Sequence, residues 1–436
     1  MRIVVWGTGV TGRATAREMI SQGHEVRLVD ENTPLRQGRS ASGGEDIPVK
    51  MVEAEDIKWA DIVIPSPGIP KDHPILEYAT RICSEIEVAY QLLSGKLIAV
   101  TGTNGKTTTV TLIYKILDAA GLNVAQGGNI SPPLISLVGS APEIVIAEIS
   151  SFQLEWIERF KPYIAVCMNI TPDHLDRYMG MEEYVTQKLR IFENQGVGDL
   201  AVINDNDTYL ANIKTKAKIA GFALNKGKRE CGAYIKDGRV WFYGEIEGKG
   251  PLIECAYPLG NGVIEDMLVS ALVARLMGVD IPVMEDVFKK FKGIHHRMEL
   301  VAEINGIKFI DDSKATNVGA VEKALSGLPS GIILILGGKD KGGDFSVVAS
   351  QYKAKIKKAI LIGQASKRIE REISCFVDVE IVSGMEEAVG LAYLSASPED
   401  TVLLSPGCAS FDMFESYAQR GESFVRCVKN LIKNKN

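Results

Sequence analysis

Short runs of apolar residues, each followed by a glycine-containing turn and a stretch of helical periodicity, recur along the whole chain. At the N-terminus, residues 2–7 (RIVVWG) predict a buried strand, residues 12–22 a helix, and residues 25–30 (EVRLVD) the next strand. Further strands are predicted at 60–68, 85–90, 96–102, 143–150, 164–170, 200–207, 307–313, 331–338, 359–364, 380–383 and 400–407. Strands that alternate with helices favour an α/β fold, with mostly parallel sheets covered by helices on both faces.

The chain is too long for a single hydrophobic core. Its 436 residues predict two to four domains, and the alternating pattern is consistent with three α/β units. Their boundaries fall near residues 93–96 and 292–296, so we expect domains at 1–93, 94–296 and 297–436. Residues 221–257 depart from the pattern, because glycines and charged residues interrupt short alternating stretches there, and this segment is interpreted as a β-rich insertion.

Composition narrows the class of protein. The hydrophobic fraction of 46% and the charged fraction of 24% are ordinary for a globular chain, and the net charge of -6 gives no reason to expect nucleic acid or a membrane as partner. The longest apolar runs, such as 331–338, are too short to cross a bilayer, and the N-terminus enters a strand directly, unlike a secretion signal. The seven cysteines are scattered without metal-site spacing, which is typical of reduced thiols. We therefore expect a soluble, cytoplasmic protein.

The N-terminal glycines suggest a bound diphosphate. Gly7, Gly9 and Gly12 follow a strand and open a helix, and Asp30 ends the next strand. In that context backbone amides at a helix N-terminus can meet a pyrophosphate. Residues 66–70 (SPGIP) end a later strand in a stiff turn that could border the same cleft. The pattern is common, and it is also compatible with a scaffold that binds no cofactor or with a nicotinamide dinucleotide site.

A second glycine-rich loop is a stronger signal. From Thr101 the chain reads T-G-T-N-G-K-T-T, although Val100 stands where the strict phosphate-loop pattern has its first glycine. The glycines let backbone amides turn inward, Lys106 can reach β- and γ-phosphate oxygens, and the Thr107 hydroxyl can be a ligand of Mg²⁺.

Metal-binding side chains follow neighbouring strands. Glu148 ends one strand, His174 and two aspartates follow the next in NITPDHLDRY, and Lys188 lies in QKLRIFEN. Taken singly, each is better explained as an ordinary strand-end acid or a core histidine. Taken together at one edge of a sheet, they favour a site for metal and phosphate.

The C-terminal third places more donors in loops that follow strands. These loops are 310–317 (IDDSKATN), 337–345 (GGKDKGGDF) and 405–414 (SPGCASFDMF). At the preceding domain junction, residues 295–299 (HHRME) offer an arginine to a transferring phosphate. Solvated loops that only cap helices are the alternative.

These motifs together resemble the ATP-dependent Mur ligases of peptidoglycan synthesis, and among them the branch that adds D-glutamate. The resemblance runs from GTGVTG to SPGCASFDMFESYAQRG and includes GTNGKTT, GGNI, AEISSFQLE, NITPDHLDRY, QKLRIFEN and DDSKATN. It implies a Rossmann-like N-terminal domain for the UDP substrate, a central P-loop ATPase-like domain for ATP, and a Rossmann-like C-terminal domain for the amino acid. In this family GTNGKTT is itself the phosphate loop, so a glycine is not required at the position of Val100.

The resemblance also implies a role for individual residues. ATP would contact Gly102, Thr103, Asn104, Gly105, Lys106, Thr107, Thr108, Arg297, Asp312 and Lys314. Two Mg²⁺ ions would be held by Thr107, Glu148, His174 and Lys188, the last of which is carbamylated in similar enzymes. The UDP substrate would lie along Val10, Thr11, Asp30, Glu31, Ser66, Pro67, Gly68, Asn129 and His174. D-glutamate would meet Thr316, Lys341, Ser410 and Phe411, with Tyr417 bordering the pocket. Lys106, His174 and Lys188 would be the catalytic residues.

The chain departs from the family pattern in one segment. Where these ligases have G-x-H-N-x-x-N, whose asparagine contacts adenine, this sequence has Gly262-Val263 and, at the last position, Asp266. The asparagine that would contact adenine is therefore absent from these positions. The loop GGKDKGG is also more basic than expected, so Lys339 is an alternative to Lys341 as the lysine that contacts D-glutamate.

Three classes of function remain to be compared. The resemblance favours a monomeric ligase acting on small molecules, and a sister Mur ligase that adds another amino acid is the runner-up. An NAD-dependent oxidoreductase would explain Gly7 to Gly12 but would leave the phosphate loop unused. A non-catalytic nucleotide-binding protein would need a catalytic position to be lost, and Lys106, Glu148, His174, Lys188 and Lys314 are all present.

Overall fold

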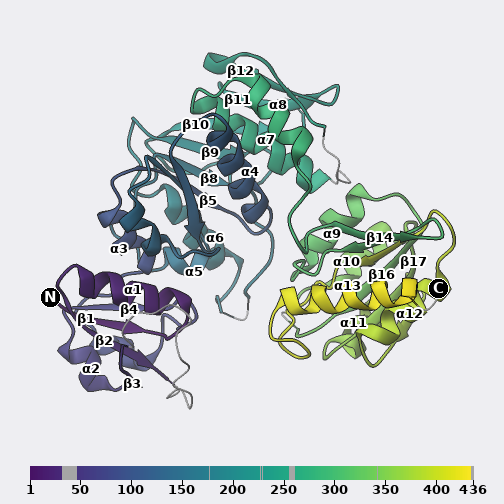
Figure 1. Cartoon of the computed structure of the whole chain (residues 1–436), viewed down its shortest axis with the longest axis horizontal. Coiled ribbons are helices and arrows are strands. Elements are labelled where there is room, and N and C mark those ends of the chain that lie inside the picture. The colour runs from purple at the N-terminus through teal and green to yellow at the C-terminus, as the bar shows by residue number, and fades with distance from the viewer. Residues whose placement is uncertain are drawn as a thin grey trace.

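The computed structural model describes residues 1–31, 47–175, 177–225, 227, 229–254, 261–340 and 342–433. Its strands form three separate sheets, and each sheet lies in one of the three predicted ranges (Figure 1). The α/β class and the mostly parallel sheets are therefore confirmed. We call the three parts the N-terminal, central and C-terminal domains, although their exact boundaries remain a prediction.

The N-terminal domain is a parallel sheet of four strands in the order β3-β2-β1-β4. Its elements are β1 (Arg2–Trp6), α1 (Val10–Ser21), β2 (Glu25–Asp30), β3 (Val49–Met51), α2 (Ala54–Trp59), β4 (Ile62–Pro65) and the 3-10 helix η1 (Pro74–Tyr78). The apolar run in β1 is buried on both faces of the sheet, as expected for a central parallel strand. Its core continues into the central domain, because residues of β1 and α1 share one apolar cluster with the central sheet.

The prediction of a strand at 85–90 is wrong. These residues form the helix α3 (Glu85–Leu92), which packs against the 3-10 helix η2 (Leu134–Ser140) of the central domain. The alternation of acidic and apolar residues in EIEV resembles a half-exposed strand, yet both acids are buried. The Glu85 carboxylate accepts a hydrogen bond from the Ile135 N–H at 2.7 Å, and the Glu87 carboxylate accepts from three successive N–H groups at residues 158–160. Tertiary partners, which the pattern does not reveal, turn this segment into a helix.

The central domain holds a sheet of nine strands in the order β13-β12-β11-β10-β9-β8-β5-β7-β6. The strands are β5 (Lys96–Thr101), β6 (Val124–Gly128), β7 (Ile144–Glu148), β8 (Ile164–Cys167), β9 (Leu200–Asn204), β10 (Lys218–Ala223), β11 (Gly232–Lys236), β12 (Arg239–Tyr243) and β13 (Gly248–Leu252). The helices are α4 (Lys106–Ala119), α5 (Ser151–Leu154), α6 (Met181–Leu189), α7 (Asn261–Leu276) and α8 (Ile281–Lys290), with short 3-10 turns η3 (Arg190–Phe192) and η4 (Gly244–Ile246). One face packs under α4, α7 and α8, and the other under α3, η2, α5 and α6.

The segment 221–257 was predicted as a β-rich insertion, and those of its residues that the structure describes continue this sheet. β10 pairs in parallel with β9 and β11, and β12 and β13 then extend the edge in antiparallel fashion.

The C-terminal domain is a six-stranded sheet in the order β14-β15-β19-β16-β17-β18, in which only the β14–β15 pair is antiparallel. Its strands are β14 (Glu299–Ile304), β15 (Ile307–Asp311), β16 (Ile332–Gly337), β17 (Ile356–Ile362), β18 (Val379–Ile381) and β19 (Thr401–Leu404). Helices α9 (Val318–Gly327), α10 (Phe345–Tyr352) and α11 (Ser366–Ile373) cover one face, and α12 (Met385–Ser395) and α13 (Tyr417–Lys433) cover the other.

The strand orders bring the predicted loops together. β5, β7 and β8 are neighbours in the central sheet, and β15, β19 and β16 are neighbours in the C-terminal sheet. Ligands of such sheets bind beyond the carboxyl ends of the strands, which is where these loops begin. Within the described ranges, no helix is both long enough and apolar enough to span a membrane.

Candidate active site

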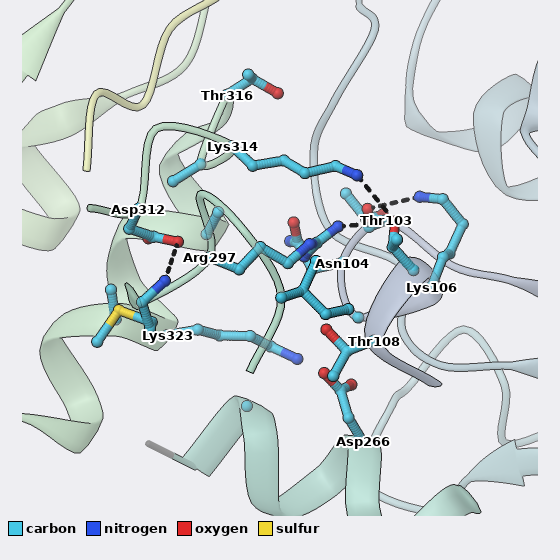
Figure 2. A pocket seen from close by; sticks show the side chains of 18 of the residues that line it. Thr103, Asn104, Lys106, Thr108, Asp266, Arg297, Asp312, Lys314, Thr316 and Lys323 are labelled. Atoms are coloured by element: carbon cyan, nitrogen blue, oxygen red, sulfur yellow. Dashed lines mark hydrogen bonds between the residues drawn. The ribbon is translucent and has the colours of Figure 1, made fainter. Parts of the chain in front are cut away.

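A cavity of about 290 Å³ lies between the central and C-terminal domains (Figure 2). The central domain contributes the loop after β5, Asn129, Glu148, Asp173 and His174 to its lining. The C-terminal domain contributes Asp312 and residues 314–317, and Arg297 enters from the segment that joins the two domains. The cavity therefore collects loops from two sheets.

Glycine conformations shape the loop between β5 and α4. Gly102 has φ +146° and Gly105 has φ +91°, a region that L side chains rarely adopt. A Cβ atom on Gly102 would lie 2.8 Å from the Cβ of Met168, so a side chain there has no room. The loop is held to the end of β8 by Asn169, whose side chain accepts from the Asn104 N–H at 2.9 Å and donates to the Asn104 carbonyl at 3.0 Å. The N-terminus of α4 thus opens into the cavity, which suits a phosphate group.

Lys106 folds back over this loop. Its Nζ donates to the carbonyls of Gly102 at 2.7 Å and Thr103 at 2.9 Å. Burial lowers the pKa of this lysine, although the charge of Glu148 opposes the shift. A phosphate in the cavity would offer the ammonium group a better partner than two neutral carbonyls.

Thr107 and Glu148 form a pair of oxygen ligands. The Thr107 hydroxyl donates to Glu148 Oε2 at 2.7 Å, and Asn129 Nδ2 donates to Glu148 Oε1 at 2.8 Å. Burial by itself would raise the pKa of this carboxyl group, but the charges of Lys106 and Lys314 and these hydrogen bonds lower it overall. An ionised carboxylate beside a hydroxyl is a donor set that fits Mg²⁺.

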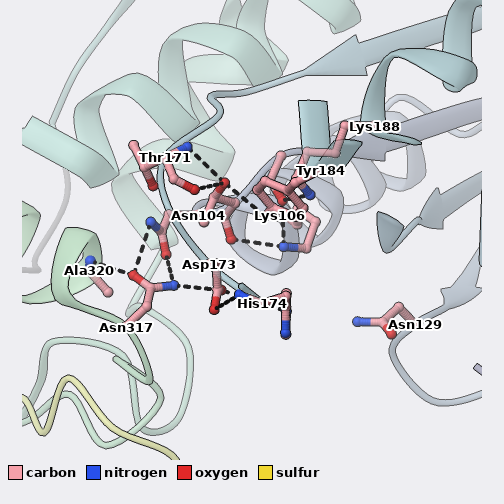
Figure 3. Close-up of polar contacts among 12 residues, drawn as sticks. Asn104, Lys106, Asn129, Thr171, Asp173, His174, Tyr184, Lys188, Asn317 and Ala320 are labelled. Carbon is pink, nitrogen blue, oxygen red and sulfur yellow. Dashed lines mark hydrogen bonds and ion pairs between the residues drawn. The ribbon is translucent and has the colours of Figure 1, made fainter. Parts of the chain in front are cut away.

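Lys188 reaches the phosphate loop, whereas His174 lies in the loop after β8 and lines the cavity (Figure 3). His174 has φ +56°, and its ring lies edge-on against Phe152 with centroids 4.7 Å apart. Lys188, on α6, is buried and donates from Nζ to the Gly102 carbonyl at 3.0 Å. Burial, with the charge of Lys106 nearby, lowers the pKa of Lys188 to about 7. A neutral amine is therefore accessible near neutral pH.

Two cations from beyond the central sheet reach the phosphate loop. Arg297 Nη2 and Lys314 Nζ donate to the Thr107 hydroxyl oxygen at 3.1 and 3.0 Å. Burial and the neighbouring Arg297 charge lower the pKa of Lys314 to about 7. Asp312 is buried, accepts from the Ser405 hydroxyl at 2.9 Å, and has a pKa raised by burial to about 7. The three side chains belong to loops that the sequence predicted at this edge.

Two family models match the chain: the Mur ligase middle domain over residues 100–240 and the glutamate ligase domain of Mur ligases over residues 296–408. The UDP-N-acetylmuramoylalanine–D-glutamate ligase of Geobacter metallireducens is 40% identical and covers 98% of this chain and 97% of its own. The chain belongs to the Mur ligase family. The ligase of the same name from Thermoanaerobacter pseudethanolicus is 41% identical over 99% of this chain and 98% of its own.

Solved structures of Mur-type ligases share the fold at low identity. MurF ligase from Thermotoga maritima in complex with ADP has a TM-score of 0.64 at 15% identity, covering 100% of this chain and 95% of that one. A pseudomurein peptide ligase type C from Methanothermus fervidus has a TM-score of 0.63 at 20% identity, with both chains covered in full.

Most of the residues that this Mur ligase was expected to use for the UDP substrate follow the carboxyl ends of β1, β2 and β4 in the N-terminal domain. Asp30 accepts from the Thr8 N–H at 2.8 Å and the Thr8 hydroxyl at 2.6 Å, which holds the glycine turn against β2. A Cβ on Gly7 would lie 2.0 Å from Ser66 Oγ, so the turns that follow β1 and β4 touch. Val10 is exposed, and Glu31 Oε1 lies 3.6 Å from His73 Nε2. Of the expected UDP-substrate residues, Asn129 and His174 line the cavity.

The expected D-glutamate residues are more scattered. Thr316 and Tyr417 line the cavity, with Lys314 Nζ 5.1 Å from the centre of the Tyr417 ring. Ser410 is buried and Phe411 is exposed, and neither is among the lining residues. Lys341 lies outside the described residues.

The segment that departs from the family pattern borders the cavity. Gly262, Val263 and Asp266 all line it. Thr109 Oγ1 lies 3.4 Å from Asp266 Oδ1, and burial raises the pKa of Asp266 to about 7. Lys339 was the alternative to Lys341 as the substrate lysine. Its backbone N–H donates to the Ala409 carbonyl with an N···O distance of 2.8 Å, and its carbonyl accepts from the Ala409 N–H with an N···O distance of 3.1 Å.

Asn317 and Arg420 are two of the residues near the site that were missed from sequence. Asn317, in the C-terminal domain, donates hydrogen bonds to Asn104 and Asp173, which lie in two loops of the central domain. Its position just before a helix indicated a helix cap but not these contacts. Arg420, 1% exposed, donates from α13 to the carbonyls of Ser313 at 2.8 Å and Cys408 at 3.0 Å. It therefore ties together the loops that follow β15 and β19. No local pattern indicates this, because an arginine in an amphipathic helix usually faces solvent.

Proposed function

We propose that the protein is an ATP-dependent ligase that adds D-glutamate to UDP-N-acetylmuramoyl-L-alanine in peptidoglycan precursor synthesis, releasing ADP and phosphate. Relatives with that name match nearly the whole chain at 38 to 41% identity. The observation that carries the proposal is the cavity in which the phosphate loop faces Arg297 and Lys314. Such a site brings a nucleotide held by one domain against a substrate held by the other.

The reaction has two steps. The terminal carboxylate of the UDP substrate attacks the γ-phosphorus of ATP, which gives an acyl phosphate and ADP. The amine of D-glutamate then attacks the acyl carbon, loses a proton, and phosphate leaves. Lys106, Arg297 and Lys314 stabilise the negative charge that builds on the transferring phosphoryl group, and the loop amides at the start of α4 orient it. Closure of the C-terminal domain supplies the positioning of amine against acyl phosphate.

The donors present fit two magnesium ions. Thr107 and the ionised Glu148 would hold one ion, and His174 with a carbamylated Lys188 would hold the other. Carbamylation converts the amine and CO₂ into an anionic carbamate and a proton, and the lowered pKa of Lys188 supports it by leaving the amine partly neutral. When bound, the ions would neutralise charge on the phosphate oxygens.

The remaining assignments are part of the same proposal. The loop residues Gly102 to Thr108, with Asp312, would hold ATP. The UDP substrate would occupy Val10, Thr11, Asp30, Glu31, Ser66, Pro67, Gly68 and Asn129, and D-glutamate would occupy Thr316, Lys341, Ser410 and Phe411. We further propose that the enzyme is a cytoplasmic monomer.

The experiment that tests this is ADP release by the purified protein with Mg²⁺, UDP-N-acetylmuramoyl-L-alanine and each candidate amino acid in turn. Release that depends on D-glutamate, with formation of the dipeptide product, is the expected result. Release with another amino acid would assign the protein to a sister ligase. No release with any of them would refute the proposal.

A further inference from the structure

Asn317 makes contacts in two domains at once (Figure 3). Its Oδ1 accepts from the Ala320 N–H at 2.9 Å and so caps α9. Its Nδ2 donates to Asp173 Oδ2 at 3.0 Å and to Asn104 Oδ1 at 3.4 Å. The residue is 8% exposed. A residue needed only as a helix cap would not require these two contacts in the central domain.

The two central partners belong to different loops of the central domain, and both line the cavity. Asn104 lies in the phosphate loop, where its backbone is fixed by Asn169. Asp173 precedes His174 and accepts its N–H at 2.9 Å through Oδ1, while Oδ2 receives Asn317. His174 holds a backbone conformation with φ +56°, which is uncommon for a residue with a side chain and requires support from its surroundings.

We infer that Asn317 is a positioning residue for the ligation: as the C-terminal domain closes, its amide group fixes Asp173 and thereby the His174 loop beside the phosphate loop. Closure of the C-terminal domain, which is proposed to hold D-glutamate, would thus fix the His174 loop, which is proposed to hold a metal ion. The kinetic consequence rests on the proposed function, whereas the structural consequence does not.

Substitutions at one position separate the cap from the bridge. Asn317→Ser keeps a good N-cap oxygen but has no amide to reach Asp173 or Asn104. Asn317→Asp keeps the cap and the shape but places a carboxylate against Asp173. Asn317→Ala loses both functions. From the usual net strength of hydrogen bonds to charged groups, Asn317→Ser should lower kcat about tenfold, and Asn317→Asp should lower it further. The N-terminal domain, which carries most of the residues proposed to hold UDP-N-acetylmuramoyl-L-alanine, is untouched, so the affinity for this substrate should change much less than kcat.

Hydrogen exchange gives a readout that needs no substrate. The N–H groups of His174, Arg177 and Tyr178 are bonded within the loop that Asp173 anchors. In Asn317→Ser these amides should exchange faster, whereas those of Ala320 and Val321 at the start of α9 should stay as protected as in the wild type. In Asn317→Ala both sets should exchange faster.

Slower turnover in Asn317→Ser, together with faster exchange confined to the His174 loop, would support the inference. Wild-type turnover and exchange in Asn317→Ser and Asn317→Asp, or losses that appear only in Asn317→Ala, would overturn it. If the wild type itself releases no ADP with these substrates, the proposed function fails, and the exchange result still decides whether Asn317 fixes the loop.

Discussion

The Thr107 hydroxyl contacts side chains from both sides of the cavity between the central and C-terminal domains. It donates to Glu148 at 2.7 Å and accepts from Lys314 at 3.0 Å and from Arg297 at 3.1 Å. Thr107→Val preserves the branched shape at the start of α4 and removes only the oxygen. Three charged groups then lose a partner, and the proposed Mg²⁺ ion loses a ligand.

The magnitude follows from this geometry. Removing one preorganised polar group from a transition-state site typically lowers turnover about 10²–10³-fold, or about 3–4 kcal/mol. We expect the upper end of that range, because the same oxygen contacts both cations and would also contact the metal. Folding should suffer little, since Glu148 keeps the 2.8 Å hydrogen bond from Asn129. Thr107→Ser retains the hydroxyl and should stay within about tenfold of wild type.

The assay is steady-state ADP release with UDP-N-acetylmuramoyl-L-alanine and D-glutamate over a titration of Mg²⁺. Thr107→Val should be slow and should need more Mg²⁺, with unchanged affinity for the UDP substrate. Turnover within tenfold of wild type in Thr107→Val, or equal losses in the valine and serine variants, would refute the central role of this hydroxyl.

Three further predictions concern two buried groups and one partly buried histidine. Burial lowers the pKa of Lys188 to about 7. The substitution Lys188→Ala should lower turnover about 100-fold, and added acetate or formate should restore part of it by replacing the carbamate. If ADP release does not recover, the result would count against carbamylation. Glu87→Gln should lower the free energy of unfolding by about 2 kcal/mol, because three N–H groups at 158–160 lose a carboxylate, and a thermal melt that matches wild type would contradict this. The hydrogen bond to Asp311, at 2.7 Å, raises the pKa of His296 against the opposing effect of burial. The interaction of protonated His296 with Asp311 therefore contributes fully to stability below about pH 6.5, and this contribution is lost as the pH rises through the folded-state pKa of His296. In His296→Asn the melting temperature should therefore decrease less above neutral pH than it does in the wild type.

Most of the fold was predictable because parallel sheets bury their strands on both faces. Runs such as RIVVW and IILILG are then continuously apolar and stand out in the sequence. The failure at 85–90 has a specific cause. The apolar residues of EIEV alternate as in a strand, and the carboxylates of Glu85 and Glu87 are buried because backbone amides far along the chain donate to them. A pattern of polar and apolar positions does not contain such partners.

The same distinction separates the two levels of the site. Lys106, Thr107 and Glu148 could be brought together from sequence, since they follow strands β5 and β7, which are adjacent in one sheet. The contacts of Asn317 with Asp173 and Asn104 could not, because they depend on how two sheets are placed relative to each other. Motifs therefore identify the groups proposed to bind phosphate within a domain, whereas a residue proposed to align the two halves of the site is visible only once the domains are packed. Asn317 Nδ2 donates at 3.0 and 3.4 Å, so a separation of the domains by about 1 Å along these contacts would lengthen both beyond hydrogen-bond range. Catalysis in such a ligase should then depend on domain closure as steeply as on any single charged group.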